Sequence, residues 1–351
     1  MRADHDLAFM MQYENIAWYE DGAVKILDRR IYPAEIKYVV CRTHEEVAQA
    51  IKDMVTQSAG PYVAAAMGMV LAAYECEGQS DAARLEYLKK AAVVLSCARP
   101  TTQKRMQLVT GACLEAAKQA AAEGRDITVS LFAEAISQNE RRYSAIEKTA
   151  GHLVSLFPEG AKIMTQCFAE TVLALMLRIC CEQGRDIKLF CPETRPYFQG
   201  ARLTASVACD MGFDVTVITD NMPAYVMKKE GIDLFTSAAD AICMDGSVIN
   251  KVGTYQISIA AKYHGIPYYV TGAPEPGHEK GSDVIIEQRD PDFVLQAMGV
   301  RTAKEGVKGY YPAFDLTPPE LVTGVVTDKG IYKPDGLSKY FEGPVSGGFL
   351  V

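Results

Sequence analysis

The sequence predicts an α/β fold, in which a Rossmann-like parallel sheet forms the C-terminal domain and a mainly helical N-terminal domain bears a small antiparallel sheet. After position 160, short apolar runs alternate with helical segments, which is typical of β-α units joined by right-handed crossovers. The chain before that point reads instead as one hairpin followed by successive helices. We therefore predict two domains, residues 1–126 and residues 127–351.

The N-terminal domain is expected to open with a hairpin, because two apolar runs flank the turn-forming pair Asp-Gly at positions 21 and 22. These runs are Ile16–Tyr19 and Ala23–Leu27. The spacing of Thr43 and Glu46 is that of a capping box and predicts a helix that begins after Thr43. Further helices are expected over Pro61–Tyr74, Ala82–Leu95, Lys104–Ala122 and Val129–Val154. Because Pro61–Tyr74 is apolar on nearly all sides, we expect it in the core rather than in a dimer contact.

The C-terminal domain reads as a series of strand-helix units. The expected strands are Lys162–Thr165, Ile187–Cys191, Asp214–Ile218, Asp233–Ala238 and Pro267–Val270. The expected helices are Glu170–Glu182, Gly200–Met211, Ala224–Lys229 and Gly253–Tyr263. No GxGxxG motif follows the first strand, so a dinucleotide is not indicated and no cofactor is expected.

Composition excludes several classes of partner. The chain of 351 residues carries a net charge of −8 without a basic cluster, so a nucleic-acid partner is not expected. No apolar run is long enough to span a bilayer, and the N-terminus lacks the apolar core of a signal peptide, so we expect a cytoplasmic protein without a membrane partner. The ten cysteines show no CxxC pair and no zinc-ligand spacing, which indicates a reducing compartment and no metal.

Polar and reactive side chains collect just past the ends of the expected strands. They are Gln166-Cys167, Pro192–Arg195, Thr219–Asn221, Ala239-Asp240 and Thr271–Ala273. In open α/β sheets, ligands bind beyond the carboxyl ends of the strands. The sequence therefore predicts a site at this edge.

Cys167 and Asp240 are the strongest candidates for chemistry at this edge. Cys167 lies at a strand-to-helix turn, where a helix dipole would favour a thiolate, although a packed core thiol is the alternative. Asp240 has small and apolar neighbours, and desolvation there would raise its pKa so that it acts as an acid near neutral pH. The alternative for Asp240 is a turn or N-cap aspartate, which is the commoner role after a strand.

Several further polar residues are candidates for binding an anion. Asn250 and Lys251 precede the helix expected at Gly253–Tyr263, so an amide, an ammonium and a helix N-terminus would form a phosphate cradle. The alternative is a turn followed by a solvated lysine. In the run ETRPYFQGARLTA, which starts at position 193, one of Arg195 and Arg202 would bind substrate and the other would hold a carboxylate such as Glu193 or Asp220.

The motifs together resemble those of the methylthioribose-1-phosphate isomerase family, within a wider group that includes ribose-1,5-bisphosphate isomerases and regulatory subunits of translation initiation factor 2B. The stretches that carry the resemblance are Ala98–Thr102, Glu193–Ala205, Ile218–Met222, Asn250–Tyr255, Ala261–Val270, Ile285–Pro291 and Tyr310–Gly330. The opening NIAWYEDGAVKILDRRIYP also fits the N-terminal strands of that family.

The resemblance implies an enzyme, an aldose–ketose isomerase that converts 5-methylthioribose 1-phosphate to 5-methylthioribulose 1-phosphate in methionine salvage. It implies that Cys167 is the catalytic cysteine and Asp240 the catalytic acid, with no metal or cofactor. The substrate- and phosphate-binding positions expected on this basis are Arg99, Gln199, Asn250 and Lys251, with Ser58, Ala59 and Arg195 added. Related chains form homodimers, so a homodimer is expected.

Two stretches depart from the family pattern. The usual His before and Asn after the cysteine are here Gln166 and Phe168, followed by Ala169-Glu170. The family's Arg-Gly-Ala-Pro loop appears here as Gln57–Pro61, so a cationic phosphate contact is lost unless Arg195, Arg202 or Lys251 replaces it. Two alternatives stay open: the same chemistry on 5-deoxyribose 1-phosphate or another pentose phosphate, and a non-catalytic sugar-phosphate or nucleotide sensor.

Overall fold

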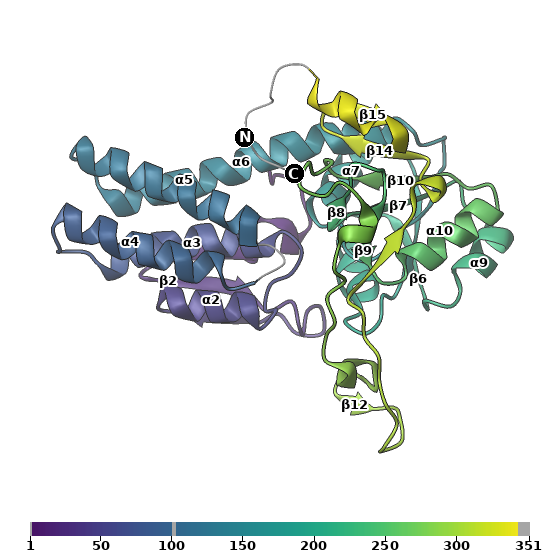
Figure 1. Ribbon diagram of the computed structural model, residues 1–351, viewed down its shortest axis with the longest axis horizontal. Helices are drawn as coiled ribbons and strands as arrows, with labels where there is room; N and C mark the ends of the chain where they lie inside the picture. Colours follow the sequence, from purple (N-terminus) through teal and green to yellow (C-terminus); the bar gives the residue numbers. More distant parts are fainter. Residues whose placement is uncertain (1, 100–102, 343–351) are drawn as a thin grey trace. The chain divides into compact units, whose positions relative to one another are not determined.

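The computed structural model describes residues 2–99 and 103–342, and these form two compact units that divide between Ser144 and Ala145 (Figure 1). The boundary expected at positions 126 and 127 lies at the start of helix α6, Ile127–Val154, whereas the two units divide within this helix. A continuous helix carries no turn or linker signal at its middle, so the division has no mark in the local sequence.

The N-terminal unit contains the expected hairpin. β1 (Ala17–Glu20) and β2 (Ala23–Leu27) pair antiparallel, and a third strand that was not expected, β3 (Tyr38–Cys41), pairs with β2. Asp21 and Gly22 both have positive φ, 49° and 71°, which suits the two-residue turn between β1 and β2. The hairpin prediction is therefore confirmed, and its sheet has one more strand than the sequence indicated.

The remainder of this unit is helical. Its helices are α1 (Tyr13–Ile16), α2 (His44–Lys52), α3 (Gly60–Glu75), α4 (Asp81–Ser96) and α5 (Gln103–Ala122), with a short 3-10 turn η1 (Phe9–Met11). The Thr43 hydroxyl accepts a hydrogen bond of 3.2 Å from the Glu46 N–H, so the predicted cap of α2 is present. Helix α3 is buried along nearly its whole length, as its apolar composition predicts.

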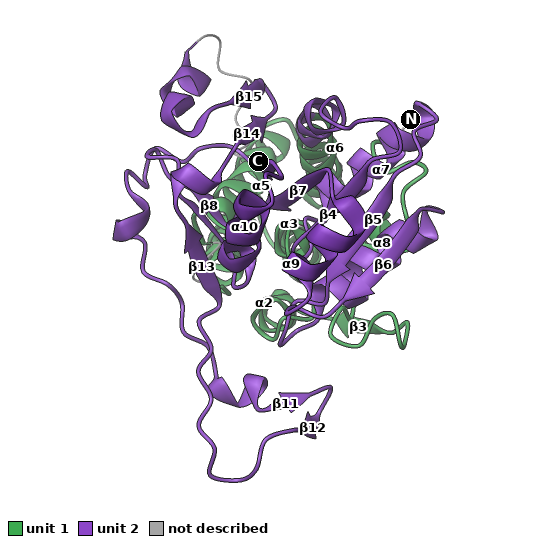
Figure 2. Ribbon diagram, turned by 90° about the vertical axis from the view of Figure 1, so that its right-hand side faces the viewer, with its two compact units in different colours: residues 1–144, 350 green, residues 145–349, 351 purple. Residues whose placement is uncertain are grey.

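The C-terminal unit is organised around a seven-stranded sheet with the order β15-β14-β10-β7-β4-β5-β6 (Figure 2). Its strands are β4 (Lys162–Met164), β5 (Lys188–Pro192), β6 (Asp214–Ile218), β7 (Leu234–Ala238), β10 (Tyr268–Thr271), β14 (Gly324–Thr327) and β15 (Gly330–Tyr332). All neighbours are parallel except β14 and β15. The Rossmann-like parallel sheet is confirmed.

Strand order in this sheet reverses at one place. The chain builds β4, β5 and β6 outward in one direction, then returns to place β7 on the other side of β4 and continues through β10 and β14. Such a reversal opens a crevice beyond the carboxyl ends of the two central strands, because their crossovers run to opposite faces. The ends of β4 and β7 therefore mark the expected place of a ligand site.

Four helices connect these strands. They are α7 (Thr171–Glu182), α8 (Ala205–Asp210), α9 (Pro223–Val226) and α10 (Thr254–Tyr263). α8 and α9 adjoin π-helical turns, η3 (Gly200–Thr204) and η4 (Met227–Gly231). A Cβ atom at Gly200 would lie 1.8 Å from the Pro192 carbonyl oxygen, so only glycine permits η3 to approach the end of β5 this closely.

A second, smaller sheet stands beside the first and was not expected from the sequence. Its strands are β8 (Ala241–Ile242), β9 (Val248–Lys251) and β13 (Phe314–Thr317), which pair antiparallel in the order β13-β9-β8. The chain between β10 and β13 makes a long excursion with two 3-10 turns and the hairpin β11 (Gln296–Ala297) and β12 (Val300–Arg301), which extends away from the rest of this unit in Figures 1 and 2. The 3-10 turns are η5 (Gly281–Asp283) and η6 (Pro291–Val294), and η7 (Pro319–Leu321) and η8 (Pro334–Phe341) follow later.

The core of the C-terminal unit joins the two sheets. One cluster of buried side chains includes Met164, Phe235 and Val270 from the large sheet and Ile242 and Val248 from the small one.

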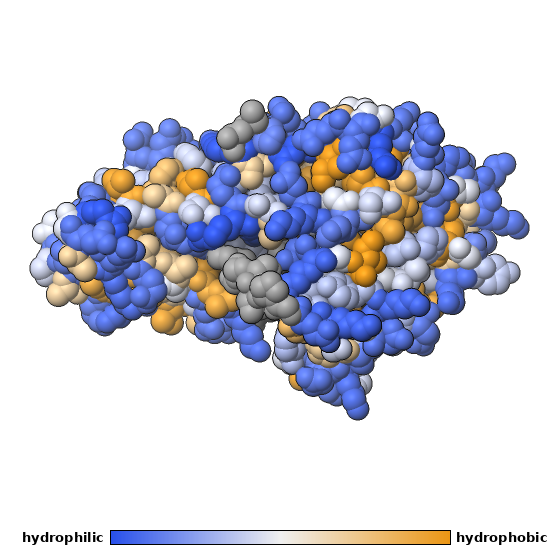
Figure 3. All heavy atoms as spheres, turned by 90° about the horizontal axis from the view of Figure 1, so that it is seen from above, coloured by the Kyte–Doolittle hydropathy of each residue, from blue (hydrophilic) through white to orange (hydrophobic). Residues whose placement is uncertain are grey.

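On the face of the molecule seen in Figure 3, hydrophilic side chains predominate and apolar ones gather in separate patches. Within the described residues, no helix has both the length and the hydropathy that a bilayer crossing requires.

Candidate active site

Cys167 and Asp240 lie at the point where the strand order reverses. Cys167 follows β4 and Asp240 follows β7, and these strands are parallel neighbours with Met164 opposite Phe235. The charge of Asp240 raises the pKa of the Cys167 thiol, so the two groups are close enough to interact. The structure thus brings together the two residues that sequence reasoning placed first.

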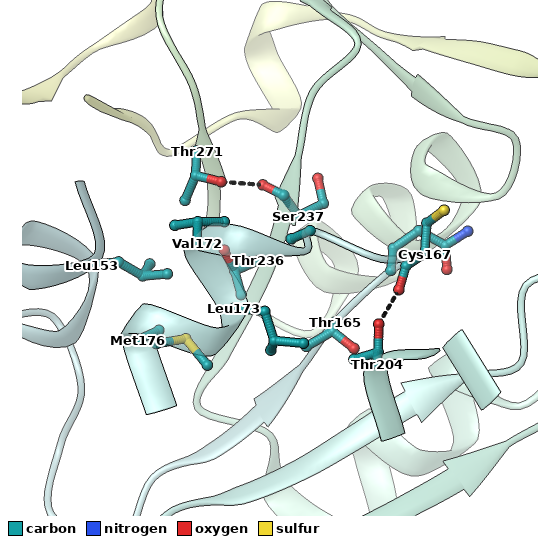
Figure 4. Close-up of a pocket in the computed structure, with 12 residues that line it drawn as sticks. Leu153, Thr165, Cys167, Val172, Leu173, Met176, Thr204, Thr236, Ser237 and Thr271 are labelled. Carbon is teal, nitrogen blue, oxygen red and sulfur yellow. Dashed lines mark hydrogen bonds between the residues drawn. The ribbon is translucent and has the colours of Figure 1, made fainter. Parts of the chain in front are cut away.

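The backbone at Cys167 is strained. Cys167 has φ of 59° and Glu170 has φ of 42°, and both lie in a region that residues with a Cβ atom rarely adopt. Two threonines hold this turn: the Cys167 N–H donates to the Thr194 hydroxyl at 3.2 Å, and the Thr204 hydroxyl donates to the Cys167 carbonyl at 2.5 Å (Figure 4). Strain that surrounding hydrogen bonds maintain is characteristic of functional sites.

The thiol of Cys167 is held in its neutral form. Burial raises its pKa to about 11, and Asp240 adds to this, whereas Lys251, the Phe168 N–H and Arg289 act in the opposite direction. The expected thiolate at a helix N-terminus is therefore wrong for the free chain. The reason is geometric: α7 begins only at Thr171, so Cys167 precedes its first turn.

Asp240 is positioned by the small sheet. Its N–H donates to the Ile249 carbonyl at 2.8 Å, just before β8 begins. The residue is exposed, so the desolvation expected from its small and apolar neighbours is absent from the structure. Of those neighbours, Ala241 and Ile242 of β8 are buried, whereas Ala238 and Ala239 are only partly buried.

Asn250 and Lys251 are buried side chains of β9. The Asn250 amide donates to the Thr254 hydroxyl at 3.0 Å, and that hydroxyl donates to the Lys251 carbonyl at 2.7 Å, which ties β9 to the start of α10. The Lys251 ammonium lies 4.9 Å from the centre of the Phe314 ring on the paired strand. The alternative of a solvated lysine is thus excluded, and Lys251 is a buried cation near the thiol.

The N-terminus of α10 is not open to a phosphate, which corrects the predicted cradle. Asp315 Oδ2 accepts hydrogen bonds from the N–H groups of Gly253 at 2.7 Å and Tyr255 at 3.1 Å. Burial raises the pKa of Asp315 to about 6, while these two donors and Lys251 oppose that rise. Asp315 was missed because it lies 60 residues beyond Tyr255 and meets it only through the pairing of β13 with β9.

Arg195 and Arg202 both donate hydrogen bonds to backbone carbonyls. Arg195 donates to the carbonyls of Gln296 at 2.8 Å and Val294 at 3.3 Å, and Arg202 donates to the carbonyl of Tyr197 at 2.7 Å. The Asp220 carboxylate accepts instead from the Thr194 and Arg195 N–H groups. Backbone donors thus hold the Asp220 carboxylate, and the pairing of an arginine with Glu193 or Asp220 stays a prediction.

Gln166 and Gln199 are both buried at this edge. The Gln166 amide donates to the Val252 carbonyl at 3.2 Å, so the residue that replaces the family's histidine joins the Cys167 turn to the segment before α10. Gln199 precedes the π-helical turn, and within the described chain its Oε1 atom has no hydrogen-bond partner. Gln199 therefore has an acceptor available for a ligand.

A small hollow, open at its mouth, lies beside the Cys167 turn (Figure 4). Its walls combine apolar side chains with hydroxyls: Leu153, Val172, Leu173, Met176, Thr165, Thr204, Thr236, Ser237 and Thr271, together with Gln166, Cys167 and Ala169. In Figure 4 the Cys167 sulfur points away from the other lining residues. The Cys167 turn therefore forms part of the wall of this hollow.

Three of the predicted binding residues belong to the N-terminal unit. Ser58, which has φ of 57°, and Ala59 lie directly before α3, and Arg99 follows α4. Their contact with substrate stays a prediction.

The same unit holds a cluster of His44, Glu45 and Glu75 whose side-chain atoms are close enough together to bind a metal ion. Glu75 already accepts from the His44 N–H at 2.6 Å and from the Tyr87 hydroxyl at 2.6 Å, which gives it a role as the cap of α2.

The fold and the strand-end site define a Rossmann-type α/β protein with reactive groups where the strand order reverses. The model of the Initiation factor 2 subunit family matches residues 55–334, and the chain belongs to this family. Methylthioribose-1-phosphate isomerase 1 of Pseudothermotoga lettingae is 36% identical over 335 residues, which cover 91% of this chain and 95% of that protein. The methylthioribose-1-phosphate isomerase of Chloroflexus aurantiacus is 37% identical over 92% of this chain and 96% of its own.

Solved structures give the same result. The crystal structure of 5-methylthioribose 1-phosphate isomerase from Pyrococcus horikoshii has a TM-score of 0.83 at 28% identity and covers 97% of this chain and 98% of its own. The structure of translation initiation factor eIF-2B, subunit delta, from A. fulgidus has a TM-score of 0.81 at 34% identity, with 91% and 96% covered. The resemblance to the methylthioribose-1-phosphate isomerase family is confirmed. The same fold also occurs in a protein that is named as a subunit of a translation initiation factor.

Proposed function

We propose that this chain is an aldose–ketose isomerase that converts 5-methylthioribose 1-phosphate to 5-methylthioribulose 1-phosphate. The observation that carries the proposal is the interacting pair Cys167 and Asp240 at the strand reversal. Relatives with this name match more than nine tenths of the chain. A non-catalytic sensor has no need of a thiol and a carboxylate on adjacent strand ends, so the pair favours an enzyme.

The reaction begins with opening of the sugar ring. C1 of the substrate carries both the ring oxygen and the phosphate ester, so the bond from C1 to the ring oxygen breaks first. Asp240, in its protonated form, donates a proton to the ring oxygen as that bond breaks. Its exposure lets the carboxylate take up a new proton from solvent between turnovers.

Hydrogen then moves from C2 to C1. In one route C2–H passes to C1 as a hydride, and the C2 hydroxyl loses its proton to leave the ketone. In the other route Cys167, as a thiolate, removes the C2 proton and leaves an enol between C1 and C2. The thiol exchanges with solvent and gives a proton to C1 as the C2 hydroxyl loses its own proton to form the ketone. This route needs the thiolate, which the charges of Lys251 and Arg289 favour.

The two routes differ in the fate of solvent hydrogen. In D2O, transfer through Cys167 introduces deuterium at C1 of the product, whereas a hydride shift leaves C1 without deuterium. Mass spectrometry of the ketose phosphate distinguishes the two outcomes. Either outcome is compatible with the isomerase, and the result assigns the role of the thiol.

The activity itself is tested with two substrates. Purified protein receives 5-methylthioribose 1-phosphate or 5-deoxyribose 1-phosphate, and ketose formation is followed. Turnover of the first substrate at the higher kcat/KM is expected, with Cys167→Ser and Asp240→Asn each lowering it about 100-fold or more. Cys209→Ser changes an exposed thiol outside the site and is expected to keep full activity.

Other experimental results would assign a different function to this chain. Preference for 5-deoxyribose 1-phosphate would give it the same chemistry on a different pentose phosphate. Binding of either sugar phosphate without turnover would favour the sensor. Full activity in Cys167→Ser or Asp240→Asn would contradict the proposed mechanism.

The proposal includes a cytoplasmic homodimer. It rests on the resemblance to the isomerase family rather than on a surface of this chain. Light scattering of the purified protein at micromolar concentration measures the mass, and about twice the 38.4 kDa chain mass is expected. A mass equal to one chain at all concentrations would contradict the dimer.

A further inference from the structure

Arg289 reaches the site from the long excursion between β10 and β13. Three contacts hold residues 287–289 antiparallel to residues 311–313. The Ala313 N–H donates to the Glu287 carbonyl at 2.8 Å, Gln288 forms a bridge with Pro312, and the Arg289 N–H donates to the Tyr311 carbonyl at 3.0 Å. This short ladder runs directly into β13, so Arg289 lies beside the strand that carries Phe314.

The guanidinium of Arg289 shares an aromatic neighbour with Lys251. Its central carbon lies 5.5 Å from the centre of the Phe314 ring, and the Lys251 ammonium lies 4.9 Å from the same centre. Aromatic rings attract cations through their electron-rich faces, which helps to hold two like charges close together. The Arg289 Nε–H donates to Glu287 Oε1 at 2.8 Å, which orients the guanidinium.

Glu287 and Phe314 hold the Arg289 guanidinium and leave its positive charge available to the site. The side chain of Arg289 is 11% exposed, whereas that of Glu287 is 34% exposed, so water screens the carboxylate more than the guanidinium. The charge of Arg289 also lowers the pKa of the Cys167 thiol and of the Tyr311 hydroxyl. Its field therefore extends to the thiol side of the ring.

A sugar phosphate needs such a charge at this place. A phosphate monoester carries about −1.5 to −2 charges at pH 7, and a single ammonium leaves part of that charge unpaired in a buried site. Lys251 and Arg289 both lie against the Phe314 ring, so Arg289 is placed to supply the second positive charge.

We propose that Arg289, oriented by Glu287 and Phe314, binds the substrate phosphate together with Lys251. This proposal rests on the proposed function, because it takes the ligand to be a phosphate monoester. Arg289 is then a residue that contacts substrate, and Glu287 and Phe314 are positioning residues. Local sequence patterns do not indicate this role, because Arg289 and Lys251 approach the same ring only through β13.

The test measures inorganic phosphate directly, by isothermal titration calorimetry. Arg289→Met and Arg289→Gln both remove the charge, and the glutamine keeps a donor for Glu287. Each is expected to weaken phosphate binding about tenfold or more, which corresponds to the loss of a charge-assisted contact. Arg289→Lys is expected to recover part of the affinity, and Arg301→Met, which changes an exposed arginine of the β11–β12 hairpin, is expected to bind as wild type.

Kinetics with 5-methylthioribose 1-phosphate supply a second readout. Loss of a phosphate contact raises KM about tenfold or more in the two neutral variants and leaves kcat within about threefold. Unchanged phosphate affinity in a folded neutral variant would overturn the proposal. So would a fall in kcat at unchanged KM, because that result places Arg289 in the chemistry of Cys167 instead.

The outcome is separable from that of the proposed function. Phosphate affinity that depends on Arg289 without any turnover retains the anion site and rejects the isomerase. Turnover with phosphate affinity independent of Arg289 retains the isomerase and rejects the anion site. Circular dichroism and the unfolding midpoint check that each variant is folded, and the glutamine variant decides the question if the methionine variant does not fold.

Discussion

Asp315 Oδ2 accepts a hydrogen bond of 2.7 Å from the Gly253 N–H, so a buried carboxylate closes the N-terminus of α10. The same atom accepts from the Tyr255 N–H at 3.1 Å. Two donors that would otherwise be open to an anion are thereby satisfied within the protein. Because Asn250 pairs with Asp315 across β9 and β13, Asp315 also joins the end of β9 to the start of α10.

Asp315→Asn is expected to change how stability depends on pH. The folded pKa of about 6 lies above the ordinary value of 3.8, so this group favours the folded state most below about pH 4 and progressively less as the pH rises through 6. Wild type is therefore expected to gain up to about 3 kcal/mol, relative to the variant, between pH 7 and pH 4. Urea unfolding of both proteins at several pH values measures this difference. A constant difference across that range would show that Asp315 has an ordinary pKa.

Asp240→Asn is expected to lower the pKa of Cys167, because the negative charge of Asp240 disfavours the thiolate. Lys251→Met is expected to raise it, because a cation that favours the thiolate is removed. The rate of iodoacetamide alkylation at Cys167, followed by peptide mass spectrometry as a function of pH, reports both shifts. Asp214→Asn alters an exposed carboxylate at the opposite end of β6 and serves as the control. Identical pH profiles in Asp240→Asn and wild type would show that the two groups do not interact.

Thr204→Val removes the hydroxyl that donates to the Cys167 carbonyl. We expect a loss of about 1 kcal/mol in the free energy of unfolding and a larger loss of kcat/KM, because the strained turn at Cys167 is then free to relax. The matched control is Thr317→Val, since the buried Thr317 hydroxyl has no hydrogen-bond partner in the described part of the chain. That control is expected to be neutral or slightly stabilising. Equal effects of the two substitutions would argue against a special role for the turn.

Gly200→Ala is expected to destabilise the protein by about 1–3 kcal/mol and to lower activity. The added methyl group would stand 1.8 Å from the Pro192 carbonyl oxygen and 2.9 Å from the Thr194 hydroxyl, which supports the Cys167 turn. Gly336→Ala adds a methyl group with nothing within 4 Å and provides the comparison. The unfolding midpoint and kcat/KM of both variants check the expectation, and a wild-type midpoint in Gly200→Ala would contradict the close packing described here.

The strands β4, β5, β6, β7 and β10, and the candidates Cys167 and Asp240 at the ends of two of them, were predictable from the sequence. Alternating apolar runs and helices identify β-α units locally, and reactive residues at strand ends fall on one edge whatever the rest of the fold. Capping at Thr43 and the turn at Asp21-Gly22 are local in the same sense. These features depend on residues that are near one another in the chain.

Only the tertiary structure determines which charged groups surround the Cys167 thiol and how strongly the thiol is buried. Burial raises the pKa of Cys167 to about 11, whereas a helix dipole at the same turn had suggested the opposite direction. Asp315 and Arg289 reach the site through the pairing of β13 with β9 and of residues 311–313 with residues 287–289. Short-range patterns carry no record of such pairings, because hydrogen bonds between strands far apart in sequence form only when the whole sheet assembles.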